Sequence, residues 1–135
     1  MVKMNIVYEG NLRCALTHEP SGSVIRTDAP TDNMGKGEAF SPTDLMAAAL
    51  GSCMLTVMGI VAGRHNIDLK GTTVEVSKEM VTSPVRRIGK ISVIFHMSPG
   101  IPQGKRTMLE AAAHSCPVHK SLHPDVQTPI EFIYP

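Results

Sequence analysis

A long uncharged stretch constrains this chain more than any other feature of its sequence. From Leu45 to Gly63 no side chain carries a charge, and apolar residues dominate. Ser41 before Pro42 predicts an N-cap followed by proline at the first helical position, and Asp44 adds a negative charge to the first turn, where the helix dipole favours it. So long an apolar helix is typical either of a membrane span or of a helix buried on nearly every side.

The surroundings of this stretch favour the buried helix. It lacks the basic flank and the interfacial aromatic residues that orient and anchor a membrane span. Its hydrophobicity is also weakened by small and hydroxyl residues, namely Gly51, Ser52, Thr56 and Gly59. One sheet can cover only one side of a helix that is apolar all round. We therefore predict that a second copy of the chain covers the remaining face, which makes the protein a homodimer.

Length and composition limit the classes of protein to which the chain can belong. A chain of 135 residues is long enough to bury a core, so we predict a single domain over residues 1–135. Thirteen basic residues against twelve acidic ones argue against partners held by bulk charge, such as nucleic acid or an anionic membrane. The N-terminus carries no apolar signal core, and three cysteines are too few for a disulfide scaffold. We expect a cytoplasmic protein whose cysteines are buried, catalytic or metal-bound.

The rest of the chain predicts strands and shorter helices around the long helix. Met4–Thr17 is typical of one extended segment, which turns at residues 20–23 and returns as a second strand, Val24–Thr27. A loop over residues 28–39 leads to the long helix, which we expect to end near Gly63–Asn66. Beyond it we predict strands Thr73–Met80 and Lys90–Met97, helices Lys105–Ser115 and Val118–Leu122, and a final edge strand Val126–Tyr134. This order predicts an α+β domain with helices packed against an antiparallel sheet.

Two of the cysteines lie in contrasting local contexts. Cys116 precedes Pro117, which disfavours helical geometry at Cys116 and predicts a helix start directly after it. A thiol at that place faces unpaired backbone N–H groups, so we expect its pKa to be lowered, with His114 as a further contributor. Cys53 lies about three turns inside the long helix, beyond the reach of the helix dipole, so a reactive Cys53 thiolate needs another cation. By the residues alone Cys116 is the better-activated thiol, and Cys53 is more typical of a small buried apolar residue.

A metal site is an alternative interpretation of the same region. Cys116, His119 and His123 are spaced so that they could share one helical face. Structural zinc sites, however, draw paired ligands from two segments, and no second Cys/His pair exists beyond Cys53. We therefore favour a solvated basic face over a zinc-binding module.

The two cysteine motifs together point to a known family. The first is Phe40-Ser-Pro-Thr-Asp-Leu-Met-Ala-Ala-Ala-Leu-Gly-Ser-Cys53, and the second, about sixty residues later, is His114-Ser-Cys116-Pro117-Val118. With the N-terminal hairpin before them, these motifs resemble the OsmC/Ohr family over nearly the whole chain. The resemblance implies an OsmC-like α+β fold, with antiparallel sheets around a long central Cys-bearing helix. It also implies an intertwined homodimer with two active sites at the subunit interface.

The resemblance also implies an activity and roles for particular residues. Members of the family are thiol peroxidases that reduce organic hydroperoxides and, in some cases, hydrogen peroxide, without a metal or organic cofactor. Carried over to this chain, Cys53 matches the peroxidatic cysteine, Cys116 the resolving cysteine, and Arg13 the arginine that holds the thiolate. A dithiol of lipoyl type or another kind would then reduce the Cys53–Cys116 disulfide. The alternative is a non-catalytic or redox-sensing protein that keeps the fold and the cysteines with little turnover.

One position departs from the family pattern. Hydroperoxide-reducing members carry a glutamate after the proline of the helix-start motif, where it pairs with the arginine, and this chain has Thr43 there. Glu38 and Asp44 are the candidate replacements. A helix turns Asp44 by about 100° from Thr43, so we favour Glu38 on the preceding glycine-rich loop. Cys14 has no role in the family pattern, and on a strand its side chain should point away from that of Arg13.

Overall fold

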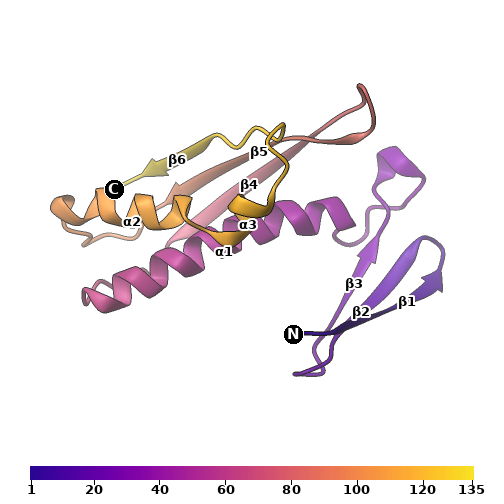
Figure 1. The fold of residues 1–135 in the computed structure, drawn as a ribbon, viewed down its shortest axis with the longest axis horizontal. Helices are drawn as coiled ribbons and strands as arrows, with labels where there is room; N and C mark the ends of the chain where they lie inside the picture. Colours follow the sequence, from indigo (N-terminus) through magenta and orange to yellow (C-terminus); the bar gives the residue numbers. More distant parts are fainter. The chain divides into compact units, whose positions relative to one another are not determined.

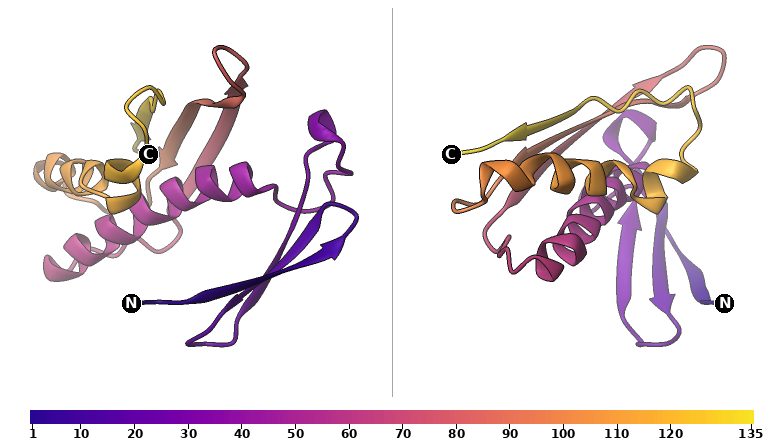
Figure 2. Two further views of the ribbon diagram at one scale, coloured as in Figure 1. Left: turned by 45° about the vertical axis from the view of Figure 1, so that its right-hand side comes forward. Right: turned by 60° about the vertical axis from the view of Figure 1, so that its left-hand side comes forward.

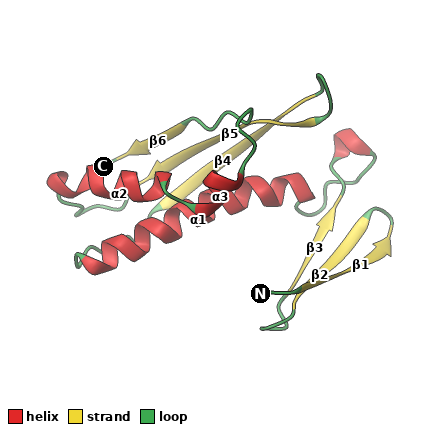
Figure 3. Ribbon diagram, viewed as in Figure 1, coloured by secondary structure: helices red, strands yellow, loops and turns green.

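The computed structural model describes all 135 residues, which form two compact units, Met1–Met46 and Ala47–Pro135. Figure 1 follows the chain through both units, and Figure 3 separates their helices and strands from the loops. Each unit contains a three-stranded sheet of its own. From the long helix onward, helices and strands occur in the predicted order, and the predicted α+β class is confirmed.

The first unit is an antiparallel sheet in the order β1-β2-β3, built from β1 (Met4–Gly10), β2 (Arg13–His18) and β3 (Val24–Asp28). The hairpin between β2 and β3 confirms the predicted turn near residues 20–23. The single extended segment predicted over Met4–Thr17 is wrong, because a tight turn divides it into two strands. Gly10, Asn11 and Leu12 have positive φ angles of 86°, 53° and 62°, which glycine and asparagine adopt more readily than other residues.

The long helix begins and ends where the local sequence predicts. Helix α1 spans Pro42–Arg64. The Ser41 hydroxyl accepts the Asp44 N–H at 3.0 Å, and the Asp44 carboxylate accepts the Ser41 N–H at 2.9 Å, which is a reciprocal capping box. At the other end, Asn66 has a positive φ of 55° and the Ile67 N–H donates to a carbonyl of the last helical turns.

The second unit continues α1 into a two-layer arrangement of helices on a sheet. Its sheet has the order β4-β5-β6, with β4 (Thr73–Val81), β5 (Arg87–His96) and β6 (Ile130–Ile133). Its helices besides α1 are α2 (Arg106–His114) and α3 (Pro117–Ser121), and a 3₁₀ turn, η2 (Gln103–Lys105), precedes α2. Both views of Figure 2 show α1 and α2 on the same side of this sheet.

The last strand differs from the prediction in length and direction. We expected a strand over Val126–Tyr134 in an antiparallel sheet, and β6 covers only Ile130–Ile133 and runs parallel to β5. The helices α2 and α3 carry the chain back to the start of β5 before β6 begins, and such a crossover produces parallel pairing. The predicted edge position is confirmed, because β6 pairs with β5 alone.

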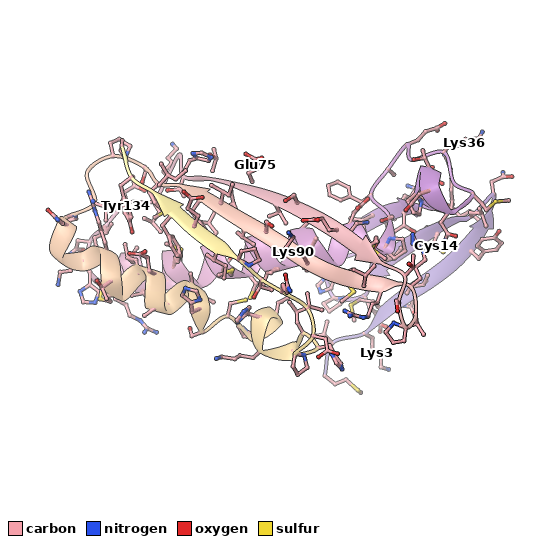
Figure 4. The ribbon with its side chains drawn as sticks, turned by 90° about the horizontal axis from the view of Figure 1, so that it is seen from above. Lys3, Cys14, Lys36, Glu75, Lys90 and Tyr134 are labelled. Atoms are coloured by element: carbon pink, nitrogen blue, oxygen red, sulfur yellow. The ribbon has the colours of Figure 1, made fainter.

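The core of the second unit lies between α1, α2 and the sheet. Alternate residues of β5, Ile91, Val93 and Phe95, are fully buried beneath Leu50 and Met54 of α1, with further core residues from α1 and α2. The opposite face of the sheet is polar, and there Lys90 pairs with Glu79 across β4 and β5 at 2.9 Å. Figure 4 views this polar face, with Lys90 and Glu75 labelled on it.

In the single chain α1 is buried along one face only. Its length and composition would suffice to cross a membrane, and 33% of its most apolar window is buried inside the structure. The buried positions recur at helical spacing: Ala47, Leu50, Gly51, Met54, Met58 and Ala62. The exposed face carries mostly small or apolar residues: Met46, Ser52, Thr56, Gly59, Ile60 and Gly63. The helix therefore keeps an uncovered apolar face, which is the property on which the prediction of a second copy depends.

Candidate functional site

Cys53 and Cys116 come together within the second unit. Cys53 lies midway along α1, is half-buried, and packs against the hydrophobic core cluster that contains the fully buried Cys116. The two side chains are near neighbours, because Cys53 packs against the cluster that contains Cys116 and is among the groups that raise the pKa of the Cys116 thiol. Both cysteines are free thiols. The sequence did not show whether these two residues meet, and the fold brings them together.

The backbone around Cys116 has the geometry that its following proline predicts. Cys116 has φ −57° and ψ 133°, outside the helical region, and α3 begins at Pro117. The Cys116 sulfur accepts the His119 backbone N–H at 3.3 Å and so serves as the N-cap of α3. The helix start predicted at this point is confirmed.

The predicted lowering of the Cys116 pKa is wrong. Burial raises the pKa of the Cys116 thiol, and the neighbouring Cys53 thiol raises it further. The His119 N–H works in the opposite direction, as expected at a helix start, but desolvation is the larger effect. His114 is not among the causes of the shift; its ring instead lies edge-on to Phe132 at 6.1 Å. Its surroundings therefore favour the neutral thiol of Cys116 over the thiolate.

In the first unit, Arg13 pairs with two carboxylates. Its Nη2 donates to Glu38 Oε2 at 2.6 Å and to Asp28 Oδ2 at 3.4 Å. The hydrogen bond to Glu38 is the largest cause that raises the pKa of Arg13, followed by the charge of Asp28. Of the two candidates to replace the glutamate absent at Thr43, Glu38 is thus the one that forms an ion pair with Arg13, while Asp44 caps α1.

Sequence reasoning missed Asp28, which is almost fully buried with 1% of its surface exposed. It is the last residue of β3 and lies directly opposite Arg13, the first residue of β2. The signal that could have found it is the register of the hairpin, because counting outward from the turn pairs Arg13 with this position. An aspartate so placed shares a sheet face with Arg13.

The other candidate residues named from the sequence have separate positions. Cys14, labelled in Figure 4, is half-buried and lies opposite Thr27 and Tyr8 in the sheet. His119 Nε2 lies 3.0 Å from the Thr128 hydroxyl, and His123 Nδ1 lies 3.7 Å from an Asp125 oxygen. No group of three His, Cys, Asp or Glu side chains is arranged to hold a metal ion, so the geometry gives the zinc alternative no support.

Comparison with known proteins identifies what the chain resembles. A family model described as OsmC-like protein matches residues 35–131. Among solved structures, a protein of Psychrobacter arcticus 273-4, provisionally described as an osmotic stress induced and detoxification response protein, is 42% identical; the match covers 98% of this chain and 96% of that chain, with a TM-score of 0.92. No curated protein matches the sequence.

More distant structures share the fold. The organic hydroperoxide resistance protein OhrB of Bacillus subtilis is 19% identical, with 98% of both chains covered and a TM-score of 0.72. An organic hydroperoxide resistance protein OsmC of Legionella pneumophila is 18% identical, with 98% of this chain and 96% of that chain covered and a TM-score of 0.77. The OsmC-like fold implied by the two cysteine motifs is therefore confirmed.

Proposed function

This chain belongs to the OsmC-like protein family, and on that premise we propose that it is a thiol peroxidase that reduces organic hydroperoxides, with hydrogen peroxide as a second candidate substrate. Family membership supports a redox role related to peroxides. The names of the B. subtilis and L. pneumophila structures, both organic hydroperoxide resistance proteins, agree with this substrate class. What we propose beyond family membership is the peroxidase activity of this chain.

The observation that carries the proposal is that Cys53 and Cys116 lie together at one hydrophobic core cluster, with the Cys53 side chain near enough to raise the pKa of the Cys116 thiol. Two cysteines 63 positions apart in the sequence meet at the edge of one hydrophobic core, one partly accessible and one fully buried. A dithiol of this kind can pass reversibly to a disulfide when an oxidant reaches the accessible sulfur. A purely structural pair of buried cysteines would need neither the contact nor the partial exposure of Cys53.

The proposed reaction has three balanced steps. The Cys53 thiolate attacks the outer oxygen of the hydroperoxide, the S–O bond forms, and the O–O bond breaks. The alkoxide takes up the proton lost by the Cys53 thiol and leaves as an alcohol, while Cys53 becomes a sulfenic acid. Cys116 then attacks that sulfur, and its proton leaves with the hydroxyl group as water. A dithiol reduces the resulting disulfide in two exchange steps and is itself oxidised to a disulfide.

We propose that the Arg13 guanidinium is the cation that the Cys53 thiolate requires. The α1 dipole cannot supply it, because Cys53 lies about three turns inside the helix. Arg13 uses Nη2 for both of its carboxylate partners, which leaves the N–H groups of Nε and Nη1 to bind other anionic or oxygen ligands. In the proposal these groups hold the thiolate and polarise the peroxide, and Glu38 orients the guanidinium.

The remaining partners follow from the same proposal. The uncovered apolar face of α1 and an open groove of 420 Å³ lined by residues of α1 and β4 support a second copy of the chain as a homodimeric partner. Strand β1 adds exposed apolar side chains, including Ile6, Val7 and Tyr8. We propose a cytoplasmic homodimer that uses a lipoyl-type or other dithiol as its reductant.

Turnover with a dithiol tests the function. Purified protein should consume an organic hydroperoxide catalytically with a dithiol reductant, and Cys53→Ser should abolish this consumption. The alternative, a redox sensor, predicts that each chain is oxidised once to the disulfide and that turnover stays at the uncatalysed level. Intact protein that loses no thiol on exposure to peroxide would rule out both.

A further inference from the structure

The structure assigns a function to Asp28: we infer that this buried carboxylate is a positioning residue that fixes the Arg13 guanidinium and the Glu38 loop for the reaction at Cys53. The inference rests on the proposed peroxidase function and extends it to a residue that the sequence motifs do not include. Its starting point is the position of Asp28, opposite Arg13 in the β2–β3 register.

Asp28 connects three segments of the first unit. Its Oδ2 accepts from Arg13 Nη2 of β2 at 3.4 Å and from the Glu38 backbone N–H of the loop at 3.1 Å. Its own backbone N–H donates to the Phe40 carbonyl at 3.1 Å, one residue before the N-cap Ser41. A single residue therefore sets where the arginine, the glutamate and the start of α1 lie relative to one another.

The two carboxylates around Arg13 differ in burial. The Asp28 side chain is 1% exposed and belongs to a strand, whereas the Glu38 side chain is 58% exposed and belongs to a loop. A short, buried side chain has little rotamer freedom to lose, while an exposed glutamate must be ordered to keep its contact. Asp28 is thus the permanent anchor of the guanidinium, and it also orders Glu38 by holding the Glu38 backbone.

Burial of the Asp28 carboxylate costs free energy that a solvent-facing carboxylate would not cost. An ionised carboxylate out of water is tolerated only when it is paired and hydrogen-bonded, and Asp28 Oδ1 is buried with no hydrogen-bond partner. A strand-end aspartate needed only to close the sheet could point to solvent at no such cost. The sheet contains that simpler case: Arg26 pairs with Glu9 at 3.2 Å, with side chains 64% and 39% exposed.

The arrangement also decides which donors of Arg13 are available. Both carboxylates accept from Nη2, so neither of them uses the N–H groups of Nε and Nη1. If Asp28 is removed, Glu38 alone holds Arg13 through an exposed contact, and the guanidinium can rotate. Removal of Asp28 should therefore lower the rate of the reaction in which the N–H groups of Arg13 Nε and Nη1 take part, the oxidation of Cys53.

The test measures the second-order rate constant for oxidation of Cys53 by an organic hydroperoxide, in the wild type and in Asp28→Asn. This variant keeps the shape of the side chain and removes its charge. We expect a loss of about tenfold or more, the scale of a lost hydrogen bond between charged groups. Glu9→Gln removes a carboxylate from the other arginine pair of the same sheet and should stay within about twofold of the wild type.

A double-mutant cycle distinguishes an effect of Asp28 through Arg13 from an effect on the structure that is independent of Arg13. If Asp28 acts through Arg13, Asp28→Asn should cause no further loss of rate in an Arg13→Ala background. Losses that multiply would show that Asp28 acts independently of Arg13 and would overturn the inference. So would an Asp28→Asn rate within about twofold of the wild type.

A second readout does not depend on activity. The Arg13 side-chain N–H order parameter measured by NMR should fall in Asp28→Asn and remain unchanged in Glu9→Gln, with the reverse pattern at Arg26. A wild type that does not react with peroxide refutes the proposed function, whereas unchanged Arg13 order in Asp28→Asn refutes the anchoring itself. Asp28→Ser is the replacement if Asp28→Asn fails to give the wild-type circular dichroism spectrum; if neither folds, Asp28 serves folding and not positioning, and the inference is overturned.

Discussion

The thiol pair of the second unit and the arginine cluster of the first unit differ in the charge state that their surroundings favour. Cys53 and Cys116 lie against an apolar core, where burial raises the pKa of Cys116 and favours the neutral thiol. Arg13 is held by two carboxylates, which raise its pKa and favour the cation. A dry environment suits a disulfide but does not ionise a thiol. The comparison shows why the proposed function takes its positive charge from Arg13: the surroundings of the sulfurs favour neutral groups, and those of Arg13 favour a cation.

The largest expected effects test the separate roles of the two thiols, reaction with peroxide at Cys53 and disulfide formation at Cys116. Cys53→Ser should lower hydroperoxide turnover to the uncatalysed rate, because Cys116, the thiol that remains of the pair, is fully buried and held in its neutral form. Cys116→Ser should leave one oxidation of Cys53 per chain and stop turnover at the sulfenic acid, which a dimedone-type probe detects by mass spectrometry. Cys14→Ser is the control with full activity. Equal turnover in Cys53→Ser and wild type would refute Cys53 as the thiol that reacts with the hydroperoxide.

The next prediction concerns the arginine cluster. Arg13→Lys keeps a positive charge beside Asp28 but loses the planar fork of donors, so the rate constant for Cys53 oxidation should fall by about 10–100-fold. The matched change Arg26→Lys, on the neighbouring strand and paired with Glu9, should leave that rate constant within about twofold. Stopped-flow measurement of both variants decides the point. A similar loss in both would mean that the sheet responds to any arginine change.

The next prediction concerns the packing of α1 on the sheet of the second unit, where an added methyl group should be tolerated at one glycine and not at another. A Cβ at Gly51 of α1 would lie 2.6 Å from Val76 Cγ2 of β4, so Gly51→Ala should lower the free energy of unfolding by about 1–3 kcal/mol. Gly63 lies in the same helix, and a Cβ added there would meet nothing within 4 Å, so Gly63→Ala should raise stability by at most about 1 kcal/mol. Urea unfolding of both variants provides the comparison.

The smallest effect is a dependence of stability on alkaline pH. Burial, together with the neighbouring Glu110, raises the pKa of Tyr134 to about 12, above the value near 10 of an unfolded tyrosine. The unfolded chain therefore releases this proton first, and stability should fall by about 1–2 kcal/mol as the pH rises from about 10 to 12. Tyr134→Phe should flatten this part of the profile. An unchanged slope in that variant would mean that other groups cause the decline.

Local signals account for what could be predicted. The N-cap at Ser41, the helix start after Cys116 and the alternation in β4 and β5 each depend on a few neighbouring residues, and the structure confirms each of them. The missed turn at Gly10–Leu12 is also local, but it depends on positive φ angles that include a leucine. The parallel direction of β6 depends on the path of two helices, which no short pattern contains.

The sequence by itself determined the long helix, the positions of its cap and of Cys53 within it, and the family to which the chain belongs. Tertiary structure alone decided that Cys53 meets Cys116, that burial outweighs the α3 N-terminus at the Cys116 thiol, and that Asp28 joins Glu38 at Arg13. Helix caps arise from hydrogen bonds between neighbours in the chain. Desolvation and ion pairs depend on which distant residues the fold brings together, and for that reason they emerge only with the packed chain.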